Sequence, residues 1–155
     1  MEIANFLTWF IVIAIVAGVA LGAMTYAYIG SGSTEVLFKD PVLLPPALPL
    51  GDAGNKASAL FQQGYDAFQA GNYRQAVDKF SKTIQMVSTF AEAYHNRGLA
   101  FANLRQDDDS VLNLVKAGEF YLQQGNQEAI AIIKQNLEAL KARKQARENR
   151  NKAKD

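Results

Sequence analysis

Cysteine is absent from this chain of 155 residues, and histidine occurs once, as His95. The absence of cysteine excludes a disulfide-stapled fold, a thiolate zinc site, an iron–sulfur site and a cysteine nucleophile. A single imidazole excludes any site that needs two histidines. The 16 basic and 15 acidic residues nearly cancel, so the net charge of +1 says little about the partners of the chain.

Catalytic motifs are also missing from the sequence. It has no nucleophile paired with a base at a known spacing, no glycine-rich phosphate loop and no nucleotide fingerprint. The densest acidic run, Asp107 to Asp109, suits the first turn of a helix better than a metal site. We therefore expect no enzymatic activity, no cofactor, no metal and no small-molecule substrate.

Charged residues are missing from the apolar run between Phe6 and Ile29. As a helix, this run measures about 36 Å, enough to cross a hydrocarbon core of about 30 Å with some tilt. Trp9 lies near one end, and Tyr26 and Tyr28 lie near the other, where aromatic rings anchor spans at the interface. The sequence predicts a transmembrane anchor in residues 1–29.

A cleaved signal peptide is the alternative for this region. It would need basic residues before an apolar run of about 7–15 residues. The first basic residue here is Lys39 and the run is longer, so a retained span is favoured. Within the span, the four-residue spacing of Ala14, Gly18 and Gly22 predicts a close helix–helix contact. No basic residue flanks the span closely, so its orientation stays open.

Proline is confined to one part of the chain, within residues 30–56, which we interpret as a linker. Glycine and serine come first, and four prolines follow that favour extended polyproline II. Leucines such as Leu43, Leu44 and Leu48 are unusual in a solvated spacer. The linker could lie along the membrane, pack on a partner, or dock on its own domain as an internal plug; a plain spacer is the remaining alternative.

A 34-residue period follows, with one unit at 57–90 and a second at 91–124. The coinciding pairs include Gly64 with Gly98, Ala76 with Ser110, Thr83 with Ala117, and Phe80 with Leu114. Two helices joined by a tight turn pack closely only where side chains are small, so the small pairs predict helix crossings. The large pair, Phe80 and Leu114, is expected to fill the space between neighbouring hairpins.

This pattern resembles the tetratricopeptide repeat (TPR) family, and the stretch AEAYHNRGLAFANL from Ala91 is particularly close. The motif residues are Leu60, Gly64, Gly71, Tyr73, Ala76, Phe80 and Thr83, then Tyr94, Gly98, Phe101, Ser110, Leu114 and Ala117. The resemblance implies an all-α fold with two TPR hairpins. The second repeat departs from the family by lacking a glycine in its turn.

A further helix is expected at 125–148, followed by a basic tail at 149–155. Its apolar residues recur every three or four positions and would form one face: Ile130, Ile133, Leu137 and Leu140. A stack of repeats leaves an apolar end exposed, so this helix is expected to cap it.

A TPR groove is lined by the first helix of each hairpin, so the resemblance also implies a partner-binding groove. The expected groove residues are Phe61, Tyr65, Phe68, Glu92, His95, Leu99 and Asn103. TPR domains that grip a chaperone's terminal carboxylate carry Lys and Asn where Phe61 and Tyr65 stand here, so that clamp is absent. The aromatic residues instead predict an apolar binding face. Some of them could equally pack in the core.

Basic residues crowd the end of the chain, namely Lys141, Arg143, Lys144, Arg147 and Arg150. Such a helix can bind anionic lipid, an acidic protein or nucleic acid, or end as a solvated helix. Beside a membrane anchor, lipid or an acidic protein is favoured over nucleic acid, and contact with lipid would put the domain on the cytoplasmic or stromal side.

An N-terminal span followed by TPRs resembles the photosystem I assembly factors of cyanobacteria and plastids. The resemblance implies a thylakoid location and a scaffold role in the assembly or stabilisation of a membrane complex. Two alternatives stay open: a stoichiometric accessory subunit of such a complex, or an envelope or secretion scaffold in a bacterial inner membrane, with its TPRs in the periplasm.

Overall fold

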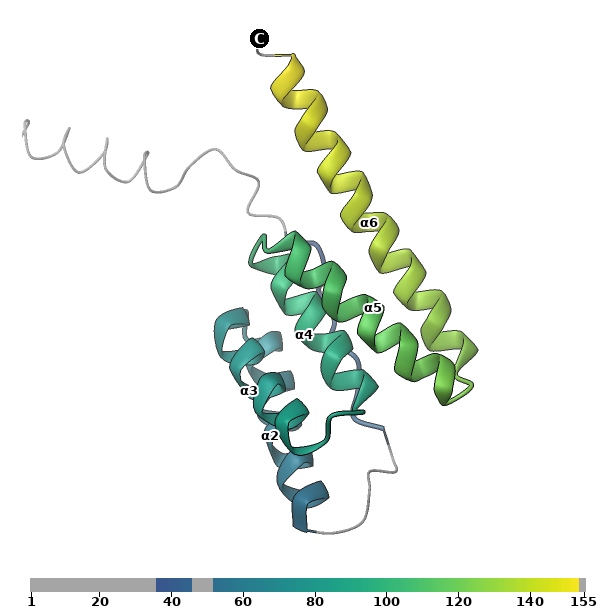
Figure 1. The fold of residues 1–155 in the computed structure, drawn as a ribbon. Helices are drawn as coiled ribbons and strands as arrows, with labels where there is room; N and C mark the ends of the chain where they lie inside the picture. Colours follow the sequence, from purple (N-terminus) through teal and green to yellow (C-terminus); the bar gives the residue numbers. More distant parts are fainter. Residues whose placement is uncertain (1–35, 46–51, 154–155) are drawn as a thin grey trace, which may run out of the picture. The chain divides into compact units, whose positions relative to one another are not determined.

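A computed structural model describes residues 36–45 and 52–153, and within them the chain is all-α and has no strand. The helices are α2 (Asp52–Gln69), α3 (Tyr73–Met86), α4 (Ala91–Asn103), α5 (Asp107–Gln123) and α6 (Gln127–Lys152) (Figure 1). The all-α prediction is thereby confirmed for this part of the chain. The expected anchor, with Ala14, Gly18 and Gly22, lies outside the described residues. Among the helices that are described, none combines the length and apolar character needed to cross a membrane.

Residues from Val36 onward form one compact unit, in which each helix packs against the next. Helices α2 and α3 form one hairpin, and α4 and α5 form a second (Figure 1). Helix α2 begins at Asp52, inside the stretch expected to be linker, and α6 continues to Lys152 through residues expected to be tail.

Glycines allow the close approach of the two helices in each hairpin. A Cβ atom on Gly64 would lie 2.7 Å from Cε1 of Phe80, and one on Gly98 would lie 3.0 Å from Cγ of Leu114. These two contacts lie 34 residues apart along the chain. They also correct one expectation: Phe80 and Leu114 pack inside their own hairpins, because the missing glycine Cβ leaves the room that each large side chain fills.

The turns after α2, α4 and α5 share one geometry. Each has a residue of positive φ, namely Gly71 at 77°, Arg105 at 64° and Gly125 at 70°. In each, the next backbone N–H reaches back to a carbonyl five residues earlier, as from Gln106 to Phe101 at 2.9 Å. This is the hydrogen bond of a Schellman C-cap. The turn after α4 therefore adopts, at Arg105, the positive φ that glycine provides in the other two turns.

Helix α6 packs on α5 through the apolar face expected from its sequence. Ile133 and Leu140 are buried, and Ile130 and Leu137 are partly buried against the core. The side chain of Asn126 accepts a hydrogen bond from the N–H of Ala129 at 3.0 Å and caps the start of the helix.

Candidate functional site

The segment Val36–Pro45 lies along α4 without regular secondary structure (Figure 1). The N–H of Phe38 donates to Oδ1 of Asn103 at 3.0 Å, and Nδ2 of Asn103 donates to the carbonyl of Phe38 at 2.7 Å. The N–H of Val42 donates to Oδ1 of Asn96 at 2.6 Å, and Nδ2 of Asn96 donates to the carbonyl of Val42 at 2.8 Å. Two side-chain amides thus hold the backbone of the segment at two points.

The spacing of these contacts shows that the segment is close to extended. Asn96 and Asn103 are seven residues apart, about two helical turns or about 10.5 Å on one face of α4. The four residue-to-residue steps from Phe38 to Val42 cover that distance in the direction opposite to α4. Each amide offers one donor and one acceptor, as a neighbouring β-strand would. The pair therefore recognises an extended backbone and places no demand on its side chains.

Side chains of the segment add an apolar contact. Pro41 is buried, and Leu37, Phe38 and Leu44 are partly buried against the core. Leu43 is 70% exposed. Of the leucines expected to dock in cis, Leu44 packs, Leu43 faces solvent and Leu48 lies outside the described residues. The linker therefore docks on its own domain, one of the alternatives from the sequence, and it lies on the face of α4 that carries Asn96 and Asn103, which we call the groove.

Four of the expected groove residues are buried with the segment in place, and one of them, Leu99, shares a face of α4 with Asn96 and Asn103. Phe61, Phe68, His95 and Leu99 are at most 3% exposed, whereas Tyr65, Glu92 and Asn103 are partly exposed. The Phe61 ring stacks on Phe90, with centroids 5.1 Å apart, and meets Phe80 edge-on at 5.4 Å. The structure therefore brings only one expected groove residue, Asn103, into a polar contact with the segment, and its partner Asn96 was not expected.

His95 was expected to line the groove, but its side chain is buried between α4, α5 and α6. Nδ2 of Asn136 donates to its Nε2 at 2.9 Å, which leaves the ring proton on Nδ1, 3.5 Å from the hydroxyl of Tyr121. Burial lowers the pKa of His95 to about 4 and raises the pKa of Tyr121 above its usual range. The imidazole is therefore neutral at pH 7 and joins three helices in the interior.

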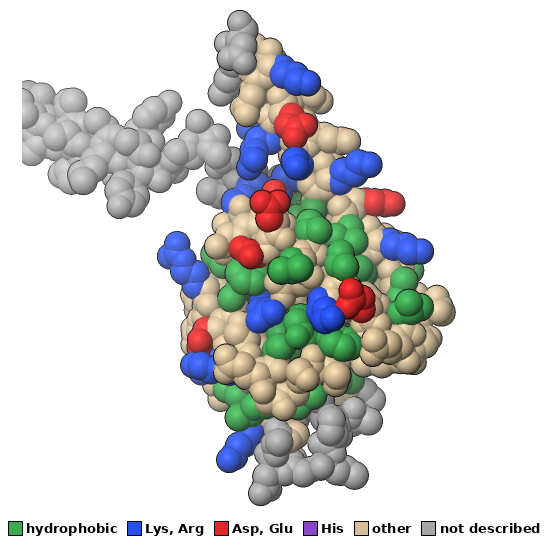
Figure 2. Space-filling model, viewed as in Figure 1, with side chains coloured by type: hydrophobic (Ala, Val, Ile, Leu, Met, Phe, Trp, Pro, Cys, Tyr) green, Lys and Arg blue, Asp and Glu red, His purple; other side chains and the backbone are tan. Residues whose placement is uncertain are grey.

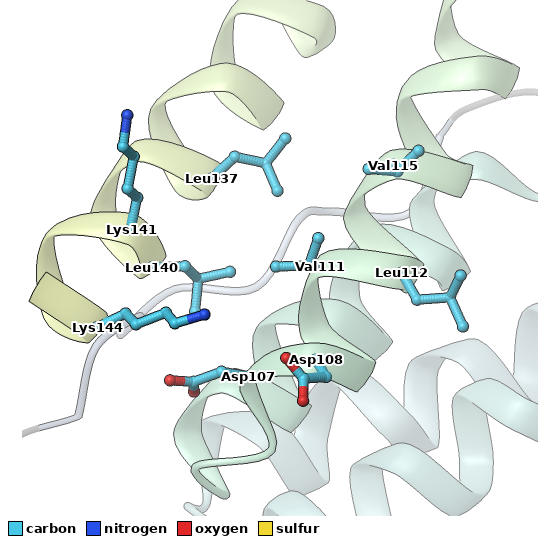
Figure 3. A pocket seen from close by; sticks show the side chains of 9 residues that line it. All are labelled: Asp107, Asp108, Val111, Leu112, Val115, Leu137, Leu140, Lys141 and Lys144. Carbon is cyan, nitrogen blue, oxygen red and sulfur yellow. The ribbon is translucent and has the colours of Figure 1, made fainter. Parts of the chain in front are cut away.

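A row of apolar side chains is exposed along α5, and the sequence analysis did not single it out. Figure 2 shows apolar side chains gathered on this face among charged ones. Val111, Leu112, Val115 and Leu122 are between 41% and 69% exposed. Leu137 and Leu140 of α6 point toward this row across a hollow of about 470 Å³ (Figure 3). On the other side, Leu112 and Val115 border a second hollow of about 290 Å³.

The basic residues of α6 differ in their surroundings. Arg143 forms an ion pair with Asp107 at the start of α5 and is mostly buried. Lys141, Lys144, Arg147 and Arg150 are exposed. The run from Asp107 to Asp109 occupies the first turn of α5, where its charge interacts favourably with the helix dipole. Within residues 36–45 and 52–153, no three His, Asp or Glu side chains are grouped so that they could hold a metal ion.

The groove and the apolar row are thus two surfaces of the described unit that suit binding. No protein-family model, curated protein or solved structure matches this chain. The function must therefore be argued from the residues of these two surfaces and from the sequence patterns that accompany them.

Proposed function

We propose that the chain is a membrane-anchored scaffold of the TPR kind, whose groove binds extended protein segments during the assembly or stabilisation of a membrane complex. The observation that carries the proposal is the double backbone contact of Asn96 and Asn103. The 34-residue recurrence of the glycine contacts and of the positive-φ turns supports the TPR assignment, with α6 as the capping helix.

The proposed partner carries an extended segment that competes with Val36–Pro45. The two asparagines contact only backbone groups, so they accept any extended chain whose side chains fit the apolar floor. The intrachain segment has the advantage of a short connection, which gives it an effective concentration of about millimolar order. A partner therefore binds when it is held at the same membrane or when it contributes further contacts.

Two sets of variants test this proposal in opposite directions. Asn96→Ala with Asn103→Ala removes the groove's contacts for any occupant and should abolish partner recovery. Val42→Pro removes the N–H that the resident segment donates to Asn96, leaves the groove intact, and should increase recovery. Asn72→Ala is the matched control, because the side chain of Asn72 makes no capping hydrogen bond.

The assay is affinity purification of the tagged full-length chain in mild detergent, with co-eluting proteins quantified. A large pigment-bearing complex recovered at low ratio, enriched in immature forms, would support an assembly role. Equal recovery by the wild-type chain, the asparagine double variant and Val42→Pro would contradict the groove as the binding site.

A stoichiometric accessory subunit is the second candidate, and the exposed row on α5 favours it. Permanent contacts bury apolar side chains such as Leu112, which is 69% exposed here. For a subunit, the complex should be recovered at a ratio near one to one, and Leu112→Lys should lower that ratio while leaving the helical content unchanged.

The proposed location is a thylakoid membrane, with the described unit on the cytoplasmic or stromal side. Protease treatment of sealed vesicles of known polarity tests the side. Digestion of α2 to α6 from the cytoplasmic face would support it. Protection from that face, together with recovery of secretion or envelope proteins, would instead favour the periplasmic scaffold.

A further inference from the structure

The chain enters the described unit at the same end from which α6 projects. Phe38 is bonded to Asn103, the last residue of α4, so Val36 lies at that end of the groove. Helix α5 begins nearby at Asp107, which forms an ion pair with Arg143 in the middle of α6. Two features distant in sequence therefore meet at one end of the unit.

Beyond Arg143, α6 extends past the start of α5 (Figure 1). The overhang, residues 144–152, adds about 14 Å of helix, and every residue in it is exposed. It carries Lys144, Arg147, Arg150 and Lys152 against a single acidic residue, Glu148. Its only apolar side chain is one alanine. The overhang is thus a positively charged rod that cannot insert into hydrocarbon and can bind only through charge.

Docking of the segment shortens the stretch of chain that links the expected anchor to the described unit. If the span ends at Ile29, six residues separate it from Val36, and these reach at most about 20 Å. Without docking, the tether would include residues 30–51 and would be more than three times longer. The reach of the short tether is comparable to the length of the overhang.

We infer that the overhang of α6 contacts the anionic headgroups of the membrane that holds the anchor, and that docking of Val36–Pro45 keeps it there. The inference rests on the membrane anchoring proposed above. Lipid phosphates are the charge partners that suit exposed arginine and lysine. They act only within about one Debye length, about 8 Å at physiological salt, so a short tether favours contact by keeping the overhang at a higher effective concentration near the lipid.

The absence of cysteine permits a direct test in the full-length chain. A fluorophore on Ala153→Cys marks the overhang, and one on Gln124→Cys, at the end of α5 just before α6 begins, marks the opposite end of the unit's last hairpin. Each labelled chain is reconstituted into phosphatidylglycerol or phosphatidylcholine vesicles that contain lipids with nitroxide headgroups, which quench only at short range. We expect strong quenching at position 153 in phosphatidylglycerol, little in phosphatidylcholine, and little at position 124 in either lipid.

Salt and substitutions in α6 test the contact of the overhang with lipid, and substitutions in the groove test the effect of docking on that contact. Raising salt to 1 M should remove the quenching at position 153. Arg147→Gln with Arg150→Gln should lower the ratio of bound to free overhang about 25-fold, at about fivefold for each basic side chain. Asn96→Ala with Asn103→Ala should lower it about sevenfold by lengthening the tether, whereas Asn72→Ala should leave it unchanged.

Quenching that is equal in the two lipids, or stronger at position 124, overturns the inference and leaves an acidic protein as the partner of α6. Flotation of the same vesicles in 1 M salt reports on the anchor separately. A chain that floats without lipid-dependent quenching contradicts the inference alone. A chain that fails to float at any salt contradicts both the inference and the proposed membrane anchor. A chain that floats only with phosphatidylglycerol at low salt supports the contact of the overhang with lipid and contradicts the anchor.

Discussion

Adding one methyl group at Gly64 should destabilise the first hairpin. The new Cβ would lie 2.7, 2.9 and 3.0 Å from three atoms of the Phe80 ring. That ring cannot move aside freely, because it is fully buried and meets Phe61 at 5.4 Å. Overpacking of this kind costs about 1–3 kcal/mol, against about 1 kcal/mol gained from replacing glycine in a helix. We expect Gly64→Ala to lower the free energy of unfolding by up to about 2 kcal/mol.

Gly118→Ala in α5 is the matched control. The nearest atom to its Cβ is Cγ2 of Ile133 at 3.6 Å, an ordinary contact, so only the helix-propensity gain remains. It should raise the free energy of unfolding by about 0.5–1 kcal/mol.

Thermal unfolding followed by far-ultraviolet circular dichroism, in one detergent for all variants, measures both effects. At about 4 °C per kcal/mol, Gly64→Ala should melt up to about 8 °C lower than the wild-type chain, and Gly118→Ala about 2–4 °C higher. Phe80→Leu should reduce the cost of Gly64→Ala in a double-mutant cycle. If Gly64→Ala melts at or above the wild-type temperature, the close crossing at Phe80 is refuted.

Two further predictions concern buried polar groups. The pKa of His95 is about 4 in the folded chain and about 6.5 when unfolded, so the unfolded state binds the proton more readily. The free energy of unfolding should therefore fall by about 3 kcal/mol between pH 6.5 and pH 4. A His95→Gln variant, followed by denaturation at each pH, should not show this contribution to the fall. Asp107→Ala should lower the free energy of unfolding in urea by about 1–2 kcal/mol, because it leaves the mostly buried guanidinium of Arg143 without its ion pair. The same change at its exposed neighbour Asp108 should alter this free energy by no more than about 0.5 kcal/mol. Equal losses at positions 107 and 108 would contradict the role of the ion pair.

The helical architecture follows from sequence spacing, because close crossings demand small residues at fixed intervals. Gly64 and Gly98 were identified in this way, and both lie at such crossings. The turn at Arg105 could not be predicted from residue type, since a positive φ disfavours a side chain by about 1–2 kcal/mol. The capping hydrogen bond from Gln106 to Phe101 closes the turn in that conformation.

The groove could be predicted only in part: Glu92, Leu99 and Asn103 were expected there, and they share a face of α4 with Asn96. His95 was wrongly placed on that face, because its side chain lies one position, or about 100° of helix rotation, from that of Asn96 and is buried beside Asn136. The signal in the sequence is the pair of asparagines seven residues apart, which must share a face. Phe61 was expected in the groove, but a side chain that large and apolar is better buried against Phe90.

Docking of Val36–Pro45 also fixes an order of events during synthesis. Phe38 leaves the ribosome 65 residues ahead of Asn103, its partner. At about 5–20 residues per second, the delay is between about 3 and 13 s. The segment therefore cannot dock before α4 has been made, and α5 and α6 leave the ribosome later still. For those seconds its apolar side chains are available to any other surface nearby, including the nascent chain of a second copy.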